Sequence, residues 1–398
     1  MNDRAAFAKI RAVIFDMDGV ITSESDYWLA AELTVLELLY SKQFLGLRND
    51  VLRTVLFKPG RAVAIDRYVS PNFVALLRNN GINTNWDLAF FSAAMYFIEI
   101  LFKVRERAII NEIRAQGITA ATLNALGHAL PSLRMDIEHI DRASSFFRQF
   151  LKKFSAAHRE APGDHHFLAR NFTAAVNAWL TERTGIDTPL FEQYNPFWQL
   201  CRSLFQERYL GDSLYQQEEG ERVSSMYKDG LIHFEMPVIP LRRIIDTLGL
   251  LRDAGIELGV ATGRPHVEIM IPLGNWNLTH FFDLNRIATY REIKAAENML
   301  EKRGAPQSLA KPHPFVYLKS LHPDRADADI IDMPLPIEDA GAVLIVGDSA
   351  ADLIAAKTIG CKSAAVMTGV KNLKAIQIMK DLEPDFVLDD MASIKELF

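Results

Sequence analysis

Strand-like apolar runs and amphipathic helical patterns alternate along much of this 398-residue chain. Residues 13–15 form a continuous apolar run, which is typical of a strand buried on both faces of a parallel sheet. Later strand-like runs lie at 256–260, 343–346, 363–367 and 386–388, with an alternating pattern at 281–287. Helical spacing predicts helices over 241–253, 292–303, 350–359 and 372–382. The alternation predicts an α/β domain to which the first strand also belongs.

The chain between residues 23 and 229 has a different character, because helical periodicity dominates and few strands are predicted. Apolar stripes at helical spacing, typical of a packed core, comprise Leu29, Leu33, Leu36, Tyr40 and Phe44, and then Phe147, Phe150, Leu151 and Phe154. The most apolar tract, 88–104, contains Glu99 and Lys103 and is short for a membrane span, so we predict a buried helix. The expected organisation is a first strand at 1–22, a helical insertion at 23–236 and the remaining α/β domain at 237–398.

Composition narrows the class of protein. An apolar content of 49% is ample for packed cores, and a net charge of −6 argues against a nucleic-acid surface as the main binding site. Two cysteines, Cys201 and Cys361, provide no disulfide framework and suit a reducing cytosol. We therefore expect a cytoplasmic protein without a signal peptide, a membrane partner or nucleic acid as its main partner.

Polar residues follow three of the predicted strands. Asp16 and Asp18 come directly after the first strand, and Thr262-Gly263-Arg264 follow the second. Asp348 ends the run at 343–346, and Asp352 lies four residues further on. Because the carboxyl ends of parallel strands meet at one edge of a sheet, these side chains are expected to converge there.

Each cluster also has a structural explanation. The two acids after the first strand can be an ordinary polar turn, and Thr262 can be a strand-end cap. Lys311 can be a surface lysine, while Asp348 with Ser349 can cap the next helix. Asp16, Asp18, Thr262 and Asp348 all follow apolar strands at the same sheet edge, which favours a functional site over coincidence.

At this point the sequence resembles the haloacid dehalogenase-like hydrolases. The matching motifs, in order, are Asp16-Met17-Asp18-Gly19-Val20, Thr262, Lys311 and Gly347-Asp348-Ser349-Ala350-Ala351-Asp352. The resemblance covers residues 1–22 and roughly 237–398. It implies a Rossmann-like core, with the insertion as a mainly helical cap that is far longer than a simple four-helix cap. The most similar group is that of phosphatases and phosphomutases related to phosphoglycolate phosphatase and β-phosphoglucomutase.

A cation is expected among the acids. Carboxylates about 4 Å apart repel by about 4 kcal/mol at an effective dielectric constant of about 20. Oxygen ligands without a histidine or cysteine cluster favour Mg²⁺. We expect Asp16 and Asp348 to bind it directly, and the resemblance adds the backbone carbonyl of Asp18. Asp352 completes this metal site, with a preferred role in orienting water or Lys311.

The residues then predict phosphoester chemistry on a small phosphorylated metabolite. Asp16 is the expected nucleophile, which forms an aspartyl-phosphate, and Asp18 is the expected general acid and base. Lys311 supplies a second positive charge, while Thr262 with neighbouring backbone N–H groups, including that of Gly263, holds the phosphoryl oxygens. Arg264 either contacts an anionic substrate or forms a core ion pair.

Rival functions remain open at this stage. A phosphomutase carries the same motifs, and a non-catalytic scaffold would use the helical insertion to bind a partner. An acid at Asp18 distinguishes the chain from dehalogenases and phosphonatases of the resembled family. The insertion is expected to cover the cleft and set specificity. Within it, His165-His166 and Trp198 are better explained by a solvated loop and a packed aromatic than by substrate contact.

Overall fold

A computed structural model of the chain describes residues 9–47, 68–78, 82, 84–130, 145, 147–149, 152, 165–368 and 373–397. The chain divides into two compact units, which we call the α/β unit (Met1–Glu24 and Glu235–Phe398) and the helical unit (Ser25–Phe234). These boundaries lie two residues from the ones expected from the sequence.

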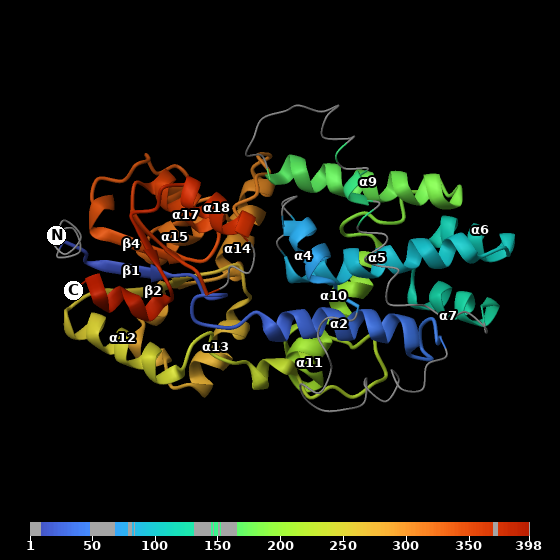
Figure 1. Cartoon of the computed structure of the whole chain (residues 1–398), viewed down its shortest axis with the longest axis horizontal. Coiled ribbons are helices and arrows are strands. Elements are labelled where there is room, and N and C mark those ends of the chain that lie inside the picture. Colours follow the sequence, from blue (N-terminus) through green and yellow to red (C-terminus); the bar gives the residue numbers. More distant parts are fainter. Residues whose placement is uncertain are drawn as a thin grey trace. The chain divides into compact units, whose positions relative to one another are not determined.

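Six parallel strands form the sheet of the α/β unit, in the order β3-β2-β1-β4-β5-β6. Strands β2, β1 and β4 lie side by side (Figure 1). They are β1 (Ala12–Phe15), β2 (Glu257–Ala261), β3 (Ile287–Ala288), β4 (Val343–Gly347), β5 (Lys362–Val366) and β6 (Phe386–Leu388). The prediction of an α/β fold with a parallel sheet is confirmed. Phe15 at the end of β1 pairs with Val260 on one side and Val346 on the other. Since the strand order reverses beside β1, the carboxyl ends of β1 and β4 flank the usual ligand position of an open sheet.

Helices connect these strands. They are α12 (Leu241–Asp253), α13 (His266–Asn275), α14 (Tyr290–Lys302), α15 (Phe315–Leu321), α16 (Asp327–Ile331), α17 (Ala350–Ile359) and α18 (Leu373–Asp381). The 3₁₀ turns are η2 (Thr279–Phe281), η3 (Leu284–Arg286), η4 (Ala340–Ala342) and η5 (Met391–Leu397). The predicted stop at Gly360 is confirmed, because this residue ends α17 with φ of 86°.

The alternating pattern at 281–287 forms a much shorter strand than its length implies. The turns η2 and η3 occupy residues 279–281 and 284–286, and only Ile287 and Ala288 pair with β2. The Asp283 side chain accepts a hydrogen bond from the backbone N–H of Asn285, which favours a turn over an extended strand here.

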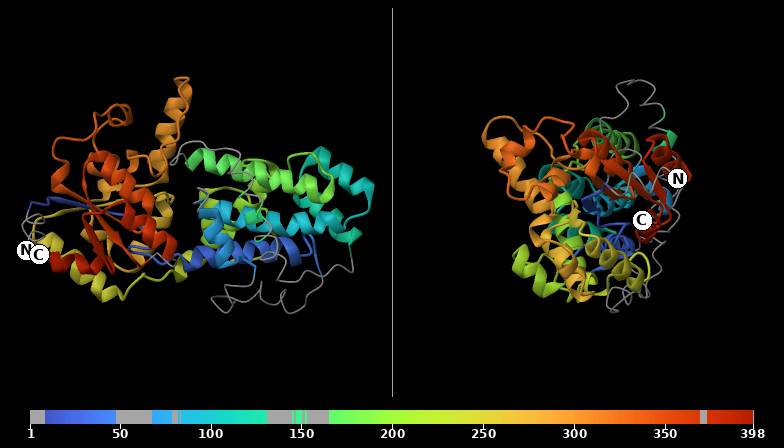
Figure 2. Two further views of the ribbon diagram at one scale, coloured as in Figure 1. Left: turned by 45° about the horizontal axis from the view of Figure 1, so that its top comes forward. Right: turned by 90° about the vertical axis from the view of Figure 1, so that its left-hand side faces the viewer.

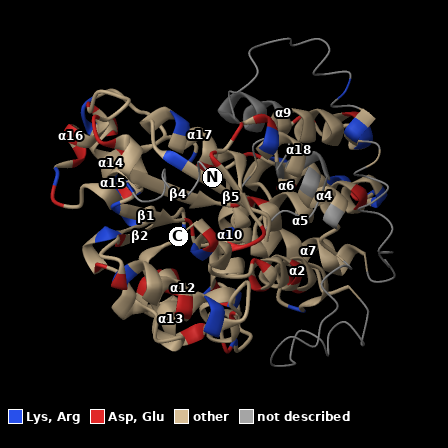
Figure 3. Ribbon diagram, turned by 60° about the vertical axis from the view of Figure 1, so that its left-hand side comes forward, with Lys and Arg blue, Asp and Glu red and all other residues tan. Residues whose placement is uncertain are grey.

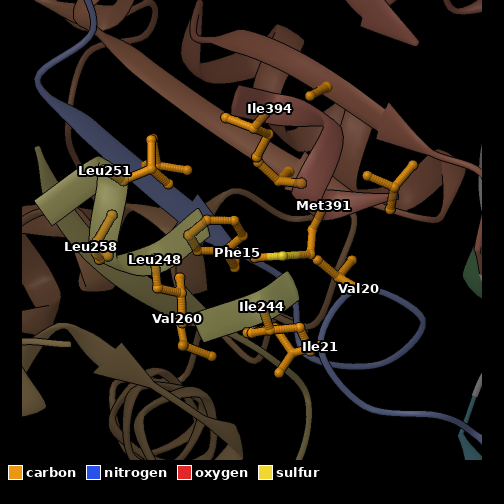
Figure 4. Close-up of a cluster of buried hydrophobic side chains, with 14 of the residues drawn as sticks. Phe15, Val20, Ile21, Ile244, Leu248, Leu251, Leu258, Val260, Met391 and Ile394 are labelled. Atoms are coloured by element: carbon orange, nitrogen blue, oxygen red, sulfur yellow. The ribbon is translucent and has the colours of Figure 1, made fainter. Parts of the chain in front are cut away.

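Alternate residues of the strands pack on opposite faces of the sheet. Val13 and Phe15 face α12, α13 and η5, and Phe15 meets Phe282 edge-to-face. Figure 4 shows Phe15 beside Leu248 of α12 and Met391 of η5. Ala12 and Ile14 face α14, α15 and α17. Strands β1 and β4 carry no charged side chain, as their uniform tan colour shows (Figure 3). Full burial of one such apolar side chain contributes about 1.5–3 kcal/mol, so the strands are firmly held up to their polar ends.

The described part of the helical unit consists of helices. They are α2 (Ser25–Tyr40), α4 (Pro71–Arg78), α5 (Asn85–Lys103), α6 (Arg107–Gln116), α7 (Ala120–Ala129), α9 (His165–Thr184), α10 (Pro196–Leu210) and α11 (Asp212–Glu218), with the turn η1 (Leu231–Phe234). The long helices α2, α5 and α9 run alongside one another (Figure 2). The stripe from Leu29 to Phe44 is buried as predicted, and so is Phe147. Phe150, Leu151 and Phe154 of the second stripe lie outside the described residues.

Helix α5 is long and apolar enough to cross a membrane by length and composition, although 78% of the relevant window is buried within the unit. The Asp87 side chain near its start accepts hydrogen bonds from Trp198 Nε1 at 2.7 Å and Gln193 Nε2 at 3.0 Å. Such burial is what a core helix of a soluble protein shows, in agreement with the prediction of a buried helix.

The outgoing and returning chains are joined where the α/β unit gives way to the insertion. Thr22 and Pro237 form an antiparallel bridge. The backbone N–H of Ser23 donates to Met236 O at 2.9 Å, and that of Val238 donates to the carbonyl of residue 21 at 2.9 Å. The insertion therefore leaves and re-enters the α/β unit at one paired segment.

Candidate active site

A tight turn after β1 presents the two acids. The N–H groups of Ile21 and Thr22 both donate to Met17 O at 2.9 Å, and Gly19, with φ of 70°, donates to Thr22 O at 2.8 Å. A left-handed conformation is inexpensive only for glycine, which explains the residue at position 19. The turn holds Asp16 at the end of the central strand.

Lys311 brings two acids together in this unit. Its Nζ lies 2.7 Å from Asp16 Oδ1 and 2.9 Å from Asp352 Oδ1. Asp16 Oδ1 also accepts the N–H of Met17 at 2.7 Å. One carboxylate oxygen each of Asp16, Asp348 and Asp352 lies within 4.8 Å of the others. Residues that follow β1 and β4 thus meet Lys311 at one point, which is the arrangement expected from the sequence.

Asp352 is fully buried and holds Lys311 in place. Tyr317 donates its hydroxyl to Asp352 Oδ1 at 2.6 Å. Ser349 donates its N–H and hydroxyl to Asp352 Oδ2 at 3.0 and 2.7 Å, completing a capping box at the start of α17. A Cβ on Gly347 would lie 2.3 Å from Asp352 Cβ, so only glycine fits there. The helix cap and the Lys311 contact are therefore two functions of one carboxylate.

The pKa values follow from burial and from these contacts. Burial, aided by the charges of Asp352 and Asp18, raises the pKa of Asp16 to about 7 against the opposing effect of Lys311. Burial also acts to raise the pKa of Asp352, but Lys311, Tyr317 and Ser349 outweigh it and lower that pKa overall. Burial acts to lower the pKa of Lys311, and the two acids raise it overall. The site therefore keeps its lysine charged.

The donor set fits a hard divalent cation. Asp16, Asp348 and Asp352 offer carboxylate oxygens, and three carboxylates against the one ammonium of Lys311 leave a net charge of −2 in this group. Oxygen-only donor sets suit Mg²⁺. Because Asp352 already accepts bonds from Lys311, Tyr317 and Ser349, Asp16 and Asp348 are the better candidates for direct ligands.

Thr262 and Arg264, in the segment after β2, make different contacts. The Thr262 hydroxyl accepts the N–H of Arg264 at 3.2 Å, and the N–H of Thr262 donates to Ala288 O at 3.1 Å. No atom lies within 4 Å of a Cβ built on Gly263, so that residue borders open space. Arg264 is buried in ion pairs with Asp18 and Glu235, which matches the second of its two expected roles.

Some contributing residues carry no signal that sequence reasoning could use. Tyr317 lies in an apolar helix and looks like any core tyrosine, and Glu235 lies at the chain's return from the insertion. The sequence predicts Ser349 only as a cap together with Asp348, whereas its partner is Asp352. In the helical unit, Trp198 is the packed aromatic that was expected. The expectation of a loop at His165 and His166 is wrong, because these two residues begin α9, and their side chains lie outside those described.

Known proteins resemble this chain in both sequence and fold. The HAD-hydrolase-like family model matches residues 308–394, which include Lys311 and Asp348. Phosphoglycolate phosphatase of Vibrio cholerae is 26% identical over 192 residues, a match that covers 48% of this chain and only 65% of that enzyme. The phosphoglycolate phosphatase of Neisseria meningitidis is 24% identical, with 48% and 76% covered. Pyrophosphatase PpaX of Bacillus cereus is 25% identical, with 47% and 75% covered.

One solved structure matches along nearly the whole chain. It is an X-ray structure of a Northeast Structural Genomics Consortium target, 27% identical, with a TM-score of 0.75 and 98% of both chains covered. The similarity therefore includes the large insertion as well as the sheet. In its motifs, its strand order and these relatives, the chain is similar to the haloacid dehalogenase-like hydrolases, and among them to the phosphoglycolate phosphatases.

Proposed function

We propose that this protein is a Mg²⁺-dependent phosphatase that hydrolyses a small phosphomonoester through an aspartyl-phosphate on Asp16. The observation that carries the proposal is the position of Lys311 Nζ, 2.7 Å from Asp16 and 2.9 Å from Asp352, beside the three converging carboxylates. An ammonium there can offset the charge of a phosphoryl group that approaches Asp16.

The metal site is proposed to consist of the carboxylates of Asp16 and Asp348 and the backbone carbonyl of Asp18. Asp352 belongs to the same site and orients Lys311, which it contacts at 2.9 Å. When bound, the cation would draw negative charge from the phosphoryl oxygens and the carboxylates. Asp16 supports this assignment, because burial and neighbouring acids raise its pKa to about 7, and an added positive charge would favour its ionised form.

In the proposed first step, a carboxylate oxygen of Asp16 attacks phosphorus and the bond from phosphorus to the substrate oxygen breaks. Asp18 gives its proton to that leaving oxygen, so that an alcohol departs. In the second step Asp18 takes a proton from water, whose oxygen attacks the phosphorus of the aspartyl-phosphate. Inorganic phosphate and the free Asp16 carboxylate result, which balances the cycle.

The phosphoryl oxygens are proposed to contact Lys311 and the segment after β2. The N–H groups of Thr262 and Arg264 are already used within the unit, so the contacts fall to the Thr262 hydroxyl and to Gly263. Open space around Gly263 supports this assignment. The same reasoning leaves Arg264 without a direct role in holding phosphate.

Substrate choice is proposed to depend on the helical insertion, because it follows the catalytic acids directly in the chain. The relatives named phosphoglycolate phosphatase and pyrophosphatase make small phosphorylated acids and inorganic pyrophosphate the first compounds to test. We also propose a cytoplasmic location, in line with two buried free cysteines.

The test is a phosphate-release screen of the purified full chain against phosphorylated sugars, nucleotides, small acids and pyrophosphate, with and without Mg²⁺. Turnover is expected only with Mg²⁺, and Asp16→Asn should abolish it, whereas Asp253→Asn on an exposed site at the end of α12 should not. Full turnover by Asp16→Asn would overturn the proposal. An isomeric phosphate ester without phosphate release would identify a phosphomutase instead.

A further inference from the structure

The guanidinium group of Arg264 has all five of its N–H donors engaged within the α/β unit. Nε lies 3.1 and 3.0 Å from the two carboxylate oxygens of Asp18. Nη2 donates to Asp18 Oδ1 at 2.5 Å and to Thr22 Oγ1 at 2.9 Å. Nη1 contacts Glu235 Oε1 at 2.9 Å and the carbonyl oxygen of Glu268 at 3.3 Å. Since a guanidinium has five donors and no acceptor, no donor remains for a substrate.

We infer that Arg264 is a positioning residue that sets the orientation of Asp18 for proton transfer. The Arg264 side chain is 2% exposed, whereas that of Asp18 is 25% exposed. A substrate can therefore reach the acid but not the arginine that holds it. The inference deepens the proposed function and rests on it, because it assigns the proton transfers to Asp18.

The arginine is held at both ends, so its orientation is well defined. Glu235, whose side chain is 1% exposed, binds Nη1 on the side away from Asp18. Thr22 lies next to the acid and contacts both the arginine and Asp18 Oδ1. A planar fork with fixed partners restricts rotation of the carboxylate that it grips. A lysine at this position would keep the charge but lose the fork.

The chemistry predicts which reactions depend on this grip. An alkyl phosphate releases a strongly basic oxygen, which needs the proton of Asp18 as the bond to phosphorus breaks. A nitrophenyl phosphate releases a stable phenolate, which can leave without that proton. Misplacing Asp18 should therefore lower kcat/KM, which reports formation of the aspartyl-phosphate, far more for the first class of substrate than for the second. The later attack of water is common to both classes and does not enter kcat/KM. A residue that bound the phosphoryl group itself would affect both classes alike.

The first experiment compares kcat/KM of the wild type, Arg264→Met and Arg264→Lys for an alkyl phosphate and for p-nitrophenyl phosphate. With Mg²⁺ present, Arg264→Met should reduce kcat/KM by about 10²-fold for the alkyl phosphate and by less than about 5-fold for the nitrophenyl ester. Arg264→Lys should show the same preference with smaller losses. Equal losses on the two substrates would overturn the inference.

The second experiment asks whether Arg264 acts through Asp18. Arg264→Met is combined with Asp18→Asn, and kcat/KM is measured with p-nitrophenyl phosphate and with the alkyl phosphate. If the arginine works only by positioning Asp18, the second substitution should lower the alkyl activity of Asp18→Asn by less than about 3-fold. Losses that multiply in full would show an independent role and would overturn the inference.

A matched arginine controls for the loss of an ion pair. Arg243 in α12 pairs with Asp390 at 2.7 Å in the same unit. Arg243→Met should leave the ratio of the two kcat/KM values unchanged. If Arg264→Met fails to fold, Arg264→Lys and Glu235→Gln carry the test, and the latter should give a smaller loss with the same substrate preference.

The failure of the inference can be told apart from failure of the proposed function. An inactive wild type, or full turnover by Asp16→Asn, would refute the phosphatase itself. An active wild type and an inactive Asp16→Asn, together with losses at Arg264 that do not depend on the leaving group, would refute only the positioning role.

Discussion

The helical unit and the α/β unit each bury a cluster of charged side chains, and the two clusters differ in their balance of charge. In the helical unit, Glu37 lies 2.6 Å from Arg208 and 3.2 Å from Lys228, which also lies 2.6 Å from Glu207. Two acids thus face two bases. The cluster of the α/β unit consists of three acids, Asp16, Asp348 and Asp352, and one base, Lys311.

The difference is visible in the pKa values of the acids. Burial opposes ionisation of Glu37, but Arg208, Lys228 and Ser224 lower its pKa overall. Burial raises the pKa of Asp16 to about 7, because Lys311 does not compensate for the loss of water and for the nearby acids. A buried cluster that neutralises itself is complete as folded. One with excess negative charge calls for a cation or a proton, and this is the property of a binding site.

The largest expected effect comes from removing a base from the balanced cluster. Lys228→Met leaves Glu37 and Glu207 buried with one base fewer, which should lower the free energy of unfolding by about 3–5 kcal/mol. Chemical denaturation of the full chain, followed by a signal from the helical unit, measures it. Lys103→Met, on the exposed end of α5, is the control. A loss below about 1 kcal/mol would mean that this cluster is not a source of stability.

The same substitution at Lys311 should affect catalysis. Lys311→Met removes the ammonium beside Asp16 and should reduce kcat/KM by about 10²–10³-fold, which is typical for the loss of one donor to a developing charge. Steady-state phosphate release in Mg²⁺ measures the change, and Lys294→Met on an exposed face of α14 serves as the control. Unchanged activity in Lys311→Met would remove the contrast between the two clusters.

Mg²⁺ should bind at the cluster with excess negative charge, which is formed by Asp16, Asp348 and Asp352, and should thereby raise the free energy of unfolding. At about 100 times its dissociation constant, a ligand that binds only the folded state adds about 2.7 kcal/mol to the free energy of unfolding. We expect this gain for the wild type and its loss in Asp348→Asn. Unfolding transitions recorded over a Mg²⁺ titration provide the measurement. An equal gain in the variant would place the ion elsewhere.

A smaller effect is expected at Tyr317, which donates a hydrogen bond to Asp352, the carboxylate that also contacts Lys311. Tyr317→Phe removes a hydrogen bond to a charged group, worth about 1.5 kcal/mol, and should lower kcat/KM about 10-fold. Tyr227→Phe, on a side chain that is largely exposed, should have no effect. If the two variants behave alike, Tyr317 is only a packing residue.

The smallest expected effect is a loss of folding stability at low pH. Because the folded state lowers the pKa of Glu37 below its ordinary value of 4.5, its stabilising contribution is present above that pH and is lost as the pH falls below it. Unfolding free energies measured across this range should fall more steeply for the wild type than for Glu37→Gln. Glu182→Gln, on an exposed face of α9, should retain the wild-type slope.

Sequence patterns were most informative where the structure is locally determined. Buried strands gave continuous apolar runs, and Gly360 marked the end of α17, so the sheet and its polar ends could be predicted. The meeting of Asp16 with Lys311 followed from strand-end positions and motif order. The contacts of Tyr317 and Glu235 could not be foreseen, because their partners lie 35 and 29 residues away in the chain and no local pattern encodes such a pairing.

The bridge between Thr22 and Pro237 has a consequence for how this chain can change over evolution. Because the bridge pairs the outgoing and returning chains, the α/β unit requires only that the insertion begin and end at adjacent points, whatever lies between them. Extra helices can therefore be added to the insertion without disturbing β1 or the turn that carries Asp16. Recognition of new substrates can then evolve in one part of the gene while the chemistry is preserved in another.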